Sequence, residues 1–321
     1  MPKLKVIYDT DPGIDDAMAL LLMARHPDIE VVGIVSSFGN GTIDTTTRNA
    51  LYLKQRLGLD APVSRGAAGP ITGVEPSEAP TYVHGDNGLG NIELPPITAT
   101  EDPRPAHRLI IDLLRESPGE ITIIAVGRMT NLALALAEAP EVAQLARQLV
   151  VMGGAFGRNG HYGNVTPVAE ANIWGDPAAA DIVFGAVWPV VIVPLDVTHE
   201  TVMSDSYVND LAEVGGEDGR FVRAISQFYQ GFYNDTMGIW GFPVHDSSAV
   251  VFALHPEFYT TETGAIRVVS EGIAFGQTII KPDSRNYPPG AWDNRPSQTI
   301  VTGVNAPAVL DFYRRTLLGS L

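Results

Sequence analysis

Near its start the chain reads Val6-Ile7-Tyr8-Asp9-Thr10-Asp11-Pro12-Gly13-Ile14-Asp15-Asp16. The apolar run ending at Tyr8 is typical of a buried strand, Pro12-Gly13 predicts a turn, and Asp15-Asp16 opens a helix. Four aspartates thus fall within eight residues. Capping explains acids in a first helical turn, but not Asp9 and Asp11 at a strand end. Clustered carboxylates repel unless protonated or joined by a cation, so the stretch favours a site for a hard divalent ion.

Outward from this stretch, short β-branched runs alternate with longer helical stretches. The expected strands are Lys5–Tyr8, Glu30–Ser36, Ile121–Val126, Leu149–Met152, Val190–Pro194, Ala265–Val269 and Thr299–Val304. The expected helices are Asp15–Arg25, Ile43–Arg56, Pro105–Arg115, Asn131–Ala137, Pro177–Phe184 and Ala308–Leu317. This alternation predicts an α/β fold, a doubly wound and mostly parallel (Rossmann-like) sheet with helices on both faces. No repeat or linker is evident, so we expect residues 1–321 to form a single domain.

Ligands of such sheets bind beyond the carboxyl ends of the strands, so polar residues that follow strands carry the most information. Two stretches rich in Gly and Pro, Gly66–Thr100 and Lys281–Ser297, are predicted long loops. Long loops in compact domains often bind ligands or close over them.

The composition excludes several classes of function. The chain has 321 residues, 37 acidic against 21 basic, for a formal net charge of −16, and no cysteine. This charge argues against binding to nucleic acid polymers and to anionic membrane surfaces. Without cysteine there are no disulfides, thiolate nucleophiles or Cys-based metal sites. The sequence enters its first strand with no signal-peptide pattern, so we expect a cytoplasmic protein.

The aspartate stretch leaves two families of enzyme to compare. A bare Asp-x-Asp after a strand also opens phosphotransferases of the haloacid dehalogenase type. The longer string from Asp9 to Ala17 resembles the signature of the inosine–uridine-preferring nucleoside hydrolases, which cleave the N-glycosidic bond of ribonucleosides. The resemblance implies the nucleoside hydrolase fold, a calcium ion in the aspartate site, and a homodimer or homotetramer.

Further motifs follow in the family's order. Asn40, between two glycines, is by itself a turn residue, but the family has a Gly-Asn here whose Asn contacts the ribose. The family ligates calcium through a backbone carbonyl just before a Gly-rich turn that leads into Thr-Asn, which implies the carbonyl of Val126. Arg128 in that turn departs from the more usual Gly or Pro, and a cation there could pair with nearby carboxylates.

The next motif combines Met152-Gly153-Gly154 with Asn164 and the segment Glu170-Ala171-Asn172. In an extended segment Glu170 and Asn172 point to the same side and offer both donors and acceptors for hydroxyl groups. Hydrogen bonds that merely stabilise the loop are an equal alternative. The family's Met-Gly-Gly and Asn…Glu-x-Asn positions hold the ribose and its 5′-hydroxyl, which implies the same for Met152, Asn164, Glu170 and Asn172.

Two histidines match motifs. Alone, Asp246 is a helix N-cap and His245 a packed or surface histidine. In the family this His-Asp supplies a leaving-group residue and the last calcium ligand. His84 opens a segment similar to the family's His-Gly-x-x-Gly-Leu, which lies near the base. The other histidines have no such context and are expected to be structural or exposed: His26, His107, His161, His199 and His255.

The resemblance implies calcium-dependent hydrolysis of ribonucleosides to free base and ribose through an oxocarbenium-like transition state. The implied ligands of Ca²⁺ are Asp11, Asp16, Asp246 and the Val126 carbonyl. Asp11 would also be the general base on the metal-bound water, and His245 the leaving-group acid.

Other roles concern the surroundings of the substrate. Asp15 and Asn40 would bind ribose hydroxyls, and Asp9 would support the metal shell from outside it. A base-stacking pocket could be lined by His84, Phe156, Tyr229, Tyr233 and Trp240, although ordinary packing is as good an explanation for the tyrosines and Trp240. Phe228–Tyr233 is expected on a helix.

Two alternatives stay open at this point. One is a metal-dependent phosphatase built on Asp9 and Asp11, although nothing basic near Asp9 in the sequence offers to bind a phosphate. The other is a non-catalytic, calcium-dependent protein that binds ribose or nucleosides. The sequence does not distinguish purine from pyrimidine substrates.

Overall fold

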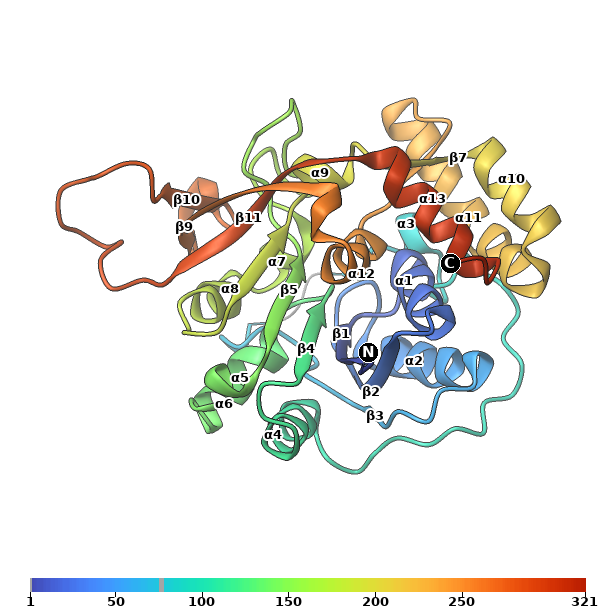
Figure 1. Cartoon of the computed structure of the whole chain (residues 1–321), viewed down its shortest axis with the longest axis horizontal. Helices are drawn as coiled ribbons and strands as arrows, with labels where there is room; N and C mark the ends of the chain where they lie inside the picture. Colours follow the sequence, from blue (N-terminus) through green and yellow to red (C-terminus); the bar gives the residue numbers. More distant parts are fainter. Residues whose placement is uncertain (1, 75–77) are drawn as a thin grey trace.

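The computed structural model describes residues 2–74 and 78–321, and its main feature is one nine-stranded sheet (Figure 1). The strand order is β10-β9-β11-β6-β5-β4-β1-β2-β3. The strands are β1 (Leu4–Thr10), β2 (Ile29–Ser36), β3 (Val63–Ser64), β4 (Ile121–Ala125), β5 (Gln148–Met152), β6 (Val190–Val193), β9 (Tyr259–Val268), β10 (Thr278–Pro282) and β11 (Ser297–Val304). Neighbours from β3 to β11 pair in parallel, whereas β9 is antiparallel to both β11 and β10. The predicted α/β fold with a mostly parallel sheet is confirmed.

Helices cover both faces of the sheet (Figure 1). One hydrophobic core lies under α1 (Ile14–Arg25), α2 (Ile43–Leu57), α11 (Gly216–Met237), α12 (Asp246–Leu254) and α13 (Ala306–Leu317). A second core lies under α4 (Ala106–Glu116), α5 (Thr130–Glu138), α6 (Val142–Leu145) and α8 (Pro177–Phe184).

Shorter elements complete the chain. They are the helices α3 (Thr81–His84), α7 (Ala171–Gly175), α9 (Leu195–Thr198) and α10 (Asp205–Val214), the 3-10 turns η1 (Pro256–Phe258) and η2 (Gly272–Ala274), and the antiparallel pair β7 (Val202–Ser204) and β8 (Gly241–Pro243). Within the described ranges, none of the helices is both long enough and apolar enough to cross a membrane.

The central strands are apolar without interruption because both of their faces are covered. In β4 the neighbouring side chains of Ile123 and Ile124 point to opposite faces, and each is fully buried, one in each core. Period-two alternation of polar and apolar residues is therefore absent from this strand, as is usual for parallel sheets between two helical layers.

The direction of chain progression reverses beside β1. From β1 the chain moves outward to β2 and β3, and it then returns to β4 on the other side of β1. The connections that leave β1 and β4 therefore diverge at the carboxyl edge, which opens a crevice between them. The aspartates follow β1 and the Val126–Asn131 turn follows β4, so the predicted motifs meet at this crevice.

The predicted elements differ from the structure at the β9 end of the sheet and before it, where α10 was not predicted and only Phe228–Tyr233 of α11 was expected to be helical. β9 begins at Tyr259, six positions before the predicted start at Ala265, and β10 was not predicted. Residues 260, 261 and 263 are exposed and polar, so no apolar run marks this half of β9. Of the predicted loops, Gly66–Thr100 contains α3, and its residues 75–77 lie outside the described chain; Lys281–Ser297 is a loop between the end of β10 and the start of β11.

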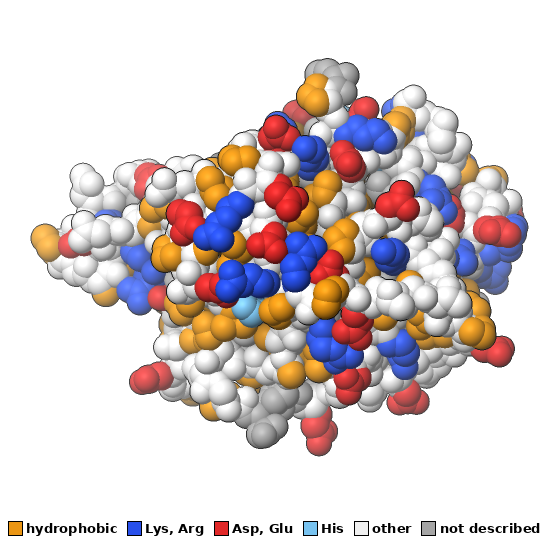
Figure 2. Space-filling model, turned by 90° about the horizontal axis from the view of Figure 1, so that it is seen from below, with side chains coloured by type: hydrophobic (Ala, Val, Ile, Leu, Met, Phe, Trp, Pro, Cys, Tyr) orange, Lys and Arg blue, Asp and Glu red, His pale blue; other side chains and the backbone are white. Residues whose placement is uncertain are grey.

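Basic and acidic side chains are mixed over the face of the molecule in Figure 2, rather than separated into areas of one sign. Ion pairs account for part of such mixing on the surface: Arg65 contacts Asp44 and Glu101, and Arg104 contacts Asp102. This side therefore offers a polyanion no extended basic surface, in keeping with the negative net charge.

Two-sided burial of β4 predicts that Ile123→Ala and Ile124→Ala destabilise the protein by similar amounts. Each change leaves a cavity in a separate core, so we expect each to lower the free energy of unfolding by about 2–5 kcal/mol. Urea denaturation followed by circular dichroism measures both losses. Val187→Ala is the control, since that side chain is 65% exposed. A loss below about 0.5 kcal/mol for either isoleucine, as for a surface substitution, would contradict coverage of its face.

Candidate functional site

A cavity of about 740 Å³ opens where the connections after β1, β2, β4 and β5 meet. It is lined by ten of the twelve predicted site residues: Asp15, Asn40, His84, Val126, Met152, Asn164, Glu170, Asn172, His245 and Asp246. The other two, Asp11 and Asp16, are buried and make hydrogen bonds to Asn40. The sheet thus brings together side chains that are up to 235 positions apart in the sequence, from Asp11 to Asp246.

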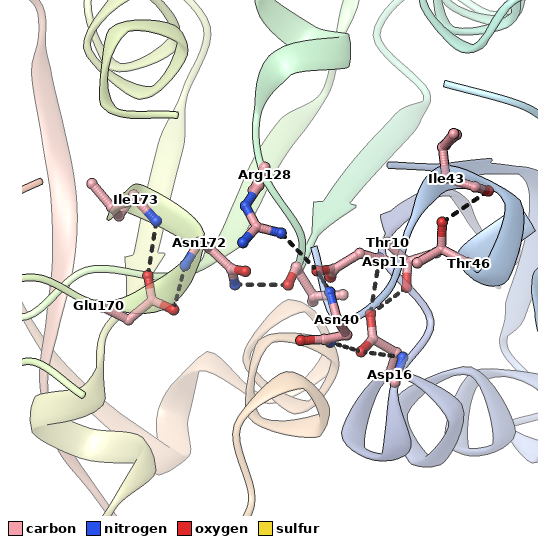
Figure 3. A network of polar contacts seen from close by, with 12 residues as sticks. Thr10, Asp11, Asp16, Asn40, Ile43, Thr46, Arg128, Glu170, Asn172 and Ile173 are labelled. Atoms are coloured by element: carbon pink, nitrogen blue, oxygen red, sulfur yellow. Dashed lines mark hydrogen bonds and ion pairs between the residues drawn. The ribbon is translucent and has the colours of Figure 1, made fainter. Parts of the chain in front are cut away.

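Asp16 is held rigidly at the start of α1 (Figure 3). Its Oδ1 accepts hydrogen bonds from the Thr10 hydroxyl and the Asp11 N–H, and its Oδ2 accepts from the Gly13 N–H and the Asn40 side-chain amide. Part of this set is helix capping, as the sequence suggested for an acid in a first turn. The bonds from Thr10 and Asn40 go beyond capping and fix the carboxylate at the cavity floor.

Asp11 lies beside Asp16 and has one satisfied oxygen. Its Oδ2 accepts the Asn40 backbone N–H at 2.8 Å and lies 3.7 Å from the Arg128 guanidinium, whereas its buried Oδ1 has no partner in the described chain (Figure 3). Burial and the neighbouring Asp16 raise the pKa of Asp11, against the effect of Arg128. No basic residue lies near Asp9 in the sequence, but the fold brings Arg128 from the turn after β4 to Asp11, and the predicted pairing of Arg128 with a carboxylate is confirmed.

Asp15, Asp16 and Asp246 form the group that converges most closely. One carboxylate oxygen from each lies within 4.8 Å of the others, and all three side chains are buried. Burial and the charge of Asp16 raise the pKa of Asp15 to about 8, and burial with the charges of Asp15 and Asp16 raises that of Asp246 well above its usual value. The group differs from the predicted ligand set, which contained Asp11 in place of Asp15.

A divalent cation fits this arrangement. The Oδ1 atoms of Asp11 and Asp15 are buried without a hydrogen-bond partner in the part of the chain that is described. Oxygen atoms of carboxylates are the ligands that Ca²⁺ and Mg²⁺ prefer, and a cation would relieve both the missing bonds and the mutual repulsion. The buried carboxylates therefore form a candidate metal site.

The carbonyl of Val126 faces the same cavity from the end of β4. It accepts a hydrogen bond from the Asn172 side-chain amide at 2.7 Å, and the same amide also donates to the Met152 carbonyl at 3.2 Å. Asn172 thus joins the ends of β4 and β5. A carbonyl oxygen has two lone pairs, so Val126 retains one for a further ligand.

Glu170 and Asn164 make local hydrogen bonds as well as facing the cavity. The Glu170 carboxylate accepts backbone N–H bonds from Gly154, Asn172 and Ile173, and so caps α7 (Figure 3). The amide oxygen of Asn164, an exposed residue, accepts the N–H of Ala171. The loop-stabilising alternative is therefore present in the structure, together with a position on the cavity wall.

His245 is fixed through both ring nitrogens. Nδ1 lies 2.7 Å from the Thr198 hydroxyl and Nε2 lies 2.8 Å from the Tyr233 hydroxyl. Tyr233 is in turn 3.4 Å from the Tyr229 hydroxyl, which donates to Asp15 at 3.4 Å. Burial lowers the pKa of His245 well below its usual value, so the resting imidazole is neutral. His245 also occupies the N-cap position of α12, whereas Asp246 is the first residue of the helix.

His84 reaches the cavity from the predicted loop. Its Nδ1 accepts the N–H of Ile14, the first residue of α1, at 3.2 Å, and its ring stacks on Tyr229. Burial lowers the pKa of His84 to about 3, so the ring is neutral. Since Nδ1 is an acceptor, Nε2 carries the proton and is a donor.

The proposed stacking residues divide into two groups. His84, Tyr229 and Tyr233 line the cavity. Phe156 and Trp240 do not: Phe156 packs against the core on the opposite face of the sheet, and Trp240 is 70% exposed. The cavity wall also includes residues that the sequence reading missed: Tyr82, Trp174, His161, His199 and Phe232. Of these, Phe232 lay on the expected helix Phe228–Tyr233 and Tyr82 in the predicted loop Gly66–Thr100, whereas no motif pointed to Trp174, His161 or His199.

Asp9 lies behind the cavity wall. Its Oδ1 accepts the Asn131 side-chain amide at 3.0 Å, its buried Oδ2 has no partner among the described residues, and burial raises its pKa to about 7. Asp9 does not line the cavity.

Comparison with known proteins relates this chain to one family of enzymes. The sequence profile described as inosine-uridine preferring nucleoside hydrolase matches residues 6–311. A probable uridine nucleosidase 1 from Oryza sativa subsp. japonica is 37% identical over 316 residues, covering 98% of this chain and 96% of that protein.

Comparison with solved structures leads to the same family. A plant nucleoside hydrolase, the PpNRh1 enzyme, superposes with a TM-score of 0.95 at 35% identity and covers 99% of both chains. A purine-preferring ribonucleoside hydrolase from Gardnerella vaginalis gives a TM-score of 0.90 at 31% identity over 98% of both chains.

The raised carboxyl pKa values predict how stability without metal depends on pH. Asp9 and Asp15 have pKa values of about 7 and 8 when folded, against 3.8 as the ordinary value. Between these pH values the two carboxyl groups are ionised in the unfolded chain but still protonated in the folded protein. The free energy of unfolding therefore falls as pH rises from about 4 to 8. In EDTA we expect the melting temperature to fall by about 5 °C or more from pH 5 to pH 8.

Differential scanning calorimetry at four pH values measures this trend. Saturating Ca²⁺ should flatten the decline, since bound metal offsets the charge, and Asp15→Asn should reduce it in EDTA. A melting temperature in EDTA that rises between pH 5 and pH 8 would contradict the raised pKa values.

Proposed function

Because the chain belongs to the inosine-uridine preferring nucleoside hydrolase family, and so hydrolyses the N-glycosidic bond of ribonucleosides, we propose that uridine is a substrate and that Ca²⁺ is the ion held by the buried aspartates. The observation that carries the proposal is the convergence of the buried carboxylates of Asp15, Asp16 and Asp246. Among the described residues, Oδ1 of Asp15 and Oδ1 of the neighbouring Asp11 have no hydrogen-bond partner. The name of the rice relative supports uridine, and that of the Gardnerella enzyme keeps purines in the test.

The residues that would hold the ion are Asp16 and Asp246, together with Asp11, Asp15 and the carbonyl of Val126. A bound divalent ion supplies positive charge that orients hydroxyl groups and water and neutralises the surrounding carboxylates. Asp15 enters this set because its oxygen converges with those of Asp16 and Asp246, in addition to its expected role toward a ribose hydroxyl.

On the side of the nucleophile, Asp11 accepts the proton of the attacking water. Its free Oδ1 is available for this, while Oδ2 is held by the Asn40 N–H. Asn40 and Asp15, both on the cavity wall, orient the ribose hydroxyls. A positioned base of this kind typically accelerates the reaction by ~10²–10⁴-fold.

On the side of the ribose ring, Asn164, Glu170 and Asn172 bind the 5′ end, and Met152 contacts the sugar. The anionic carboxylate of Glu170, fixed by three backbone N–H groups, favours the positive charge that develops on the ring oxygen.

On the side of the leaving base, His245 delivers a proton together with Tyr233. The resting imidazole is neutral, and its Nε2 is hydrogen-bonded to the Tyr233 hydroxyl. A proton taken up from solvent therefore passes through this pair to the base, and solvent receives in return the proton that Asp11 removes from the attacking water. His84, with its proton on Nε2, donates a hydrogen bond toward an acceptor on the base. Protonation removes the negative charge that develops on the departing base.

Several expectations remain predictions: one domain over residues 1–321, association into a homodimer or homotetramer, and a cytoplasmic location. The phosphatase alternative has lost its basis, because the match over residues 6–311 is to nucleoside hydrolases. A protein that binds nucleosides without cleaving them is separated from the enzyme by the next experiment.

A panel of uridine, cytidine, inosine and adenosine tests the function directly. We expect release of ribose, measured as reducing sugar, from uridine at least, loss of release in EDTA, and recovery on addition of Ca²⁺. Asp11→Asn is the matched inactive control, since it keeps the size of the side chain. Tight binding of every nucleoside without release of base would show a binding protein instead.

His245→Ala tests the leaving-group role. We expect nucleoside binding to persist and turnover of uridine to fall by about 10²–10⁴-fold, because the base must depart without a proton. Turnover of p-nitrophenyl riboside, whose leaving group needs no proton, should change little. Equal losses on both substrates would remove His245 from this role.

A further inference from the structure

Arg128 places a positive charge inside the carboxylate site. It follows β4 in the turn where the resemblance anticipates Gly or Pro, and it is only 6% exposed. Its Nη1 lies 3.7 Å from Asp11 Oδ2, which is an ion pair but too long for a hydrogen bond. Its Nε is buried and has no partner within the described ranges. Arg128 therefore interacts with its surroundings through charge and shape.

The side chain lies in a slot that fixes its position. The guanidinium carbon is 4.8 Å from the centre of the Phe38 ring. A Cβ on Gly39 would come within 2.2 Å of Nη1, and a Cβ on Gly175 within 1.7 Å of Nε, so both walls need glycine. The walls come from the connection after β2 and from the last residue of α7, so packing adds to the ion pair in holding the cation toward Asp11.

The charges around Arg128 are acidic. Asp11, Glu170 and Asp176 act on its guanidinium. Asp11 is in turn repelled by Asp15 and Asp16, and Asp246 by the same two aspartates and by Asp11. Arg128 and a divalent ion would therefore be attracted by the same negative charge, from two sides of Asp11.

We propose that Arg128 is a built-in counter-cation of the carboxylate cluster, which stabilises the metal-free protein and weakens the binding of the divalent ion by sharing the charge of Asp11. The inference rests on the metal site of the proposed function. Two like-charged cations around one carboxylate repel each other, so each lowers the affinity for the other. The metal-free fold is stabilised because the positive charge of Arg128 partly offsets the repulsion among the aspartates.

The experiment compares Arg128→Met, Arg128→Gln and Arg128→Lys with the unchanged protein. Arg56→Met is the matched control: Arg56 also lies over an aromatic ring, 4.0 Å from the centre of Phe221, and its Nε is also buried without a partner in the described structure. Two quantities are measured without any substrate. They are the melting temperature in EDTA and the dissociation constant of Ca²⁺, obtained by isothermal titration calorimetry.

For Arg128→Met we expect the melting temperature in EDTA to fall by about 5 °C and Ca²⁺ to bind about tenfold more tightly. Saturating Ca²⁺ should reduce the difference in melting temperature between Arg128→Met and the unchanged protein. Arg128→Lys, which keeps the charge, should restore most of both values, and Arg128→Gln should behave like Arg128→Met. If Arg128→Met does not fold in EDTA, Arg128→Gln supplies the comparison. Arg56→Met should leave the affinity for Ca²⁺ unchanged.

Tighter binding is the decisive sign, because loss of packing or of a structural contact would weaken the ion site. Unchanged or weaker binding of Ca²⁺ by both uncharged variants would overturn the proposal, as would an equal effect of Arg56→Met. Failure of the proposed function is a separate result: it would appear as absence of base release from the unchanged protein while these measurements still respond to Arg128.

Discussion

Mutual repulsion among buried carboxylates is the constraint on which the site depends. Asp11, Asp15, Asp16 and Asp246 are all at least nine-tenths buried, and burial is the largest cause of the raised pKa of each. An isolated pair of such groups would protonate or move apart. Here the fold supplies partial compensation from backbone N–H groups, from the start of α1 and from Arg128, and it leaves two oxygens for a cation.

The sheet topology explains why these groups meet at all. Strand order reverses between β1 and β4, so the connections after β1, β2 and β4 meet above one crevice instead of lying over separate strands. The His245-Asp246 pair then enters from α12, which packs against α1. A rigid sheet fixes the floor of the cavity, whereas loops and short helices supply the walls that would contact a nucleoside.

The sheet and the floor of the site could be predicted from the sequence more completely than the walls of the cavity. Buried strands such as β4 are continuous apolar runs, and the aspartate motif lies within one short stretch, so both could be predicted. The polar half of β9 and the two-residue β3 carry no apolar pattern. The convergence of Asp15 rather than Asp11 with Asp246, and the contacts of His161 and His199 with the cavity, depend on side-chain packing between distant segments, which spacing does not encode. Arg128 could be recognised as a departure, but its reach to Asp11 could not.

The two ends of the sheet have a consequence for behaviour at high concentration. The outermost strands are β3, with two residues, and β10, with five residues that end in Lys281-Pro282. Short edges that carry a charge and a proline present few free backbone groups for pairing with another molecule. A wide parallel sheet is slow to assemble and prone to intermolecular β-pairing while incomplete. In the folded protein, these short edges disfavour pairing with the sheet of a neighbouring molecule, and therefore growth of a fibril.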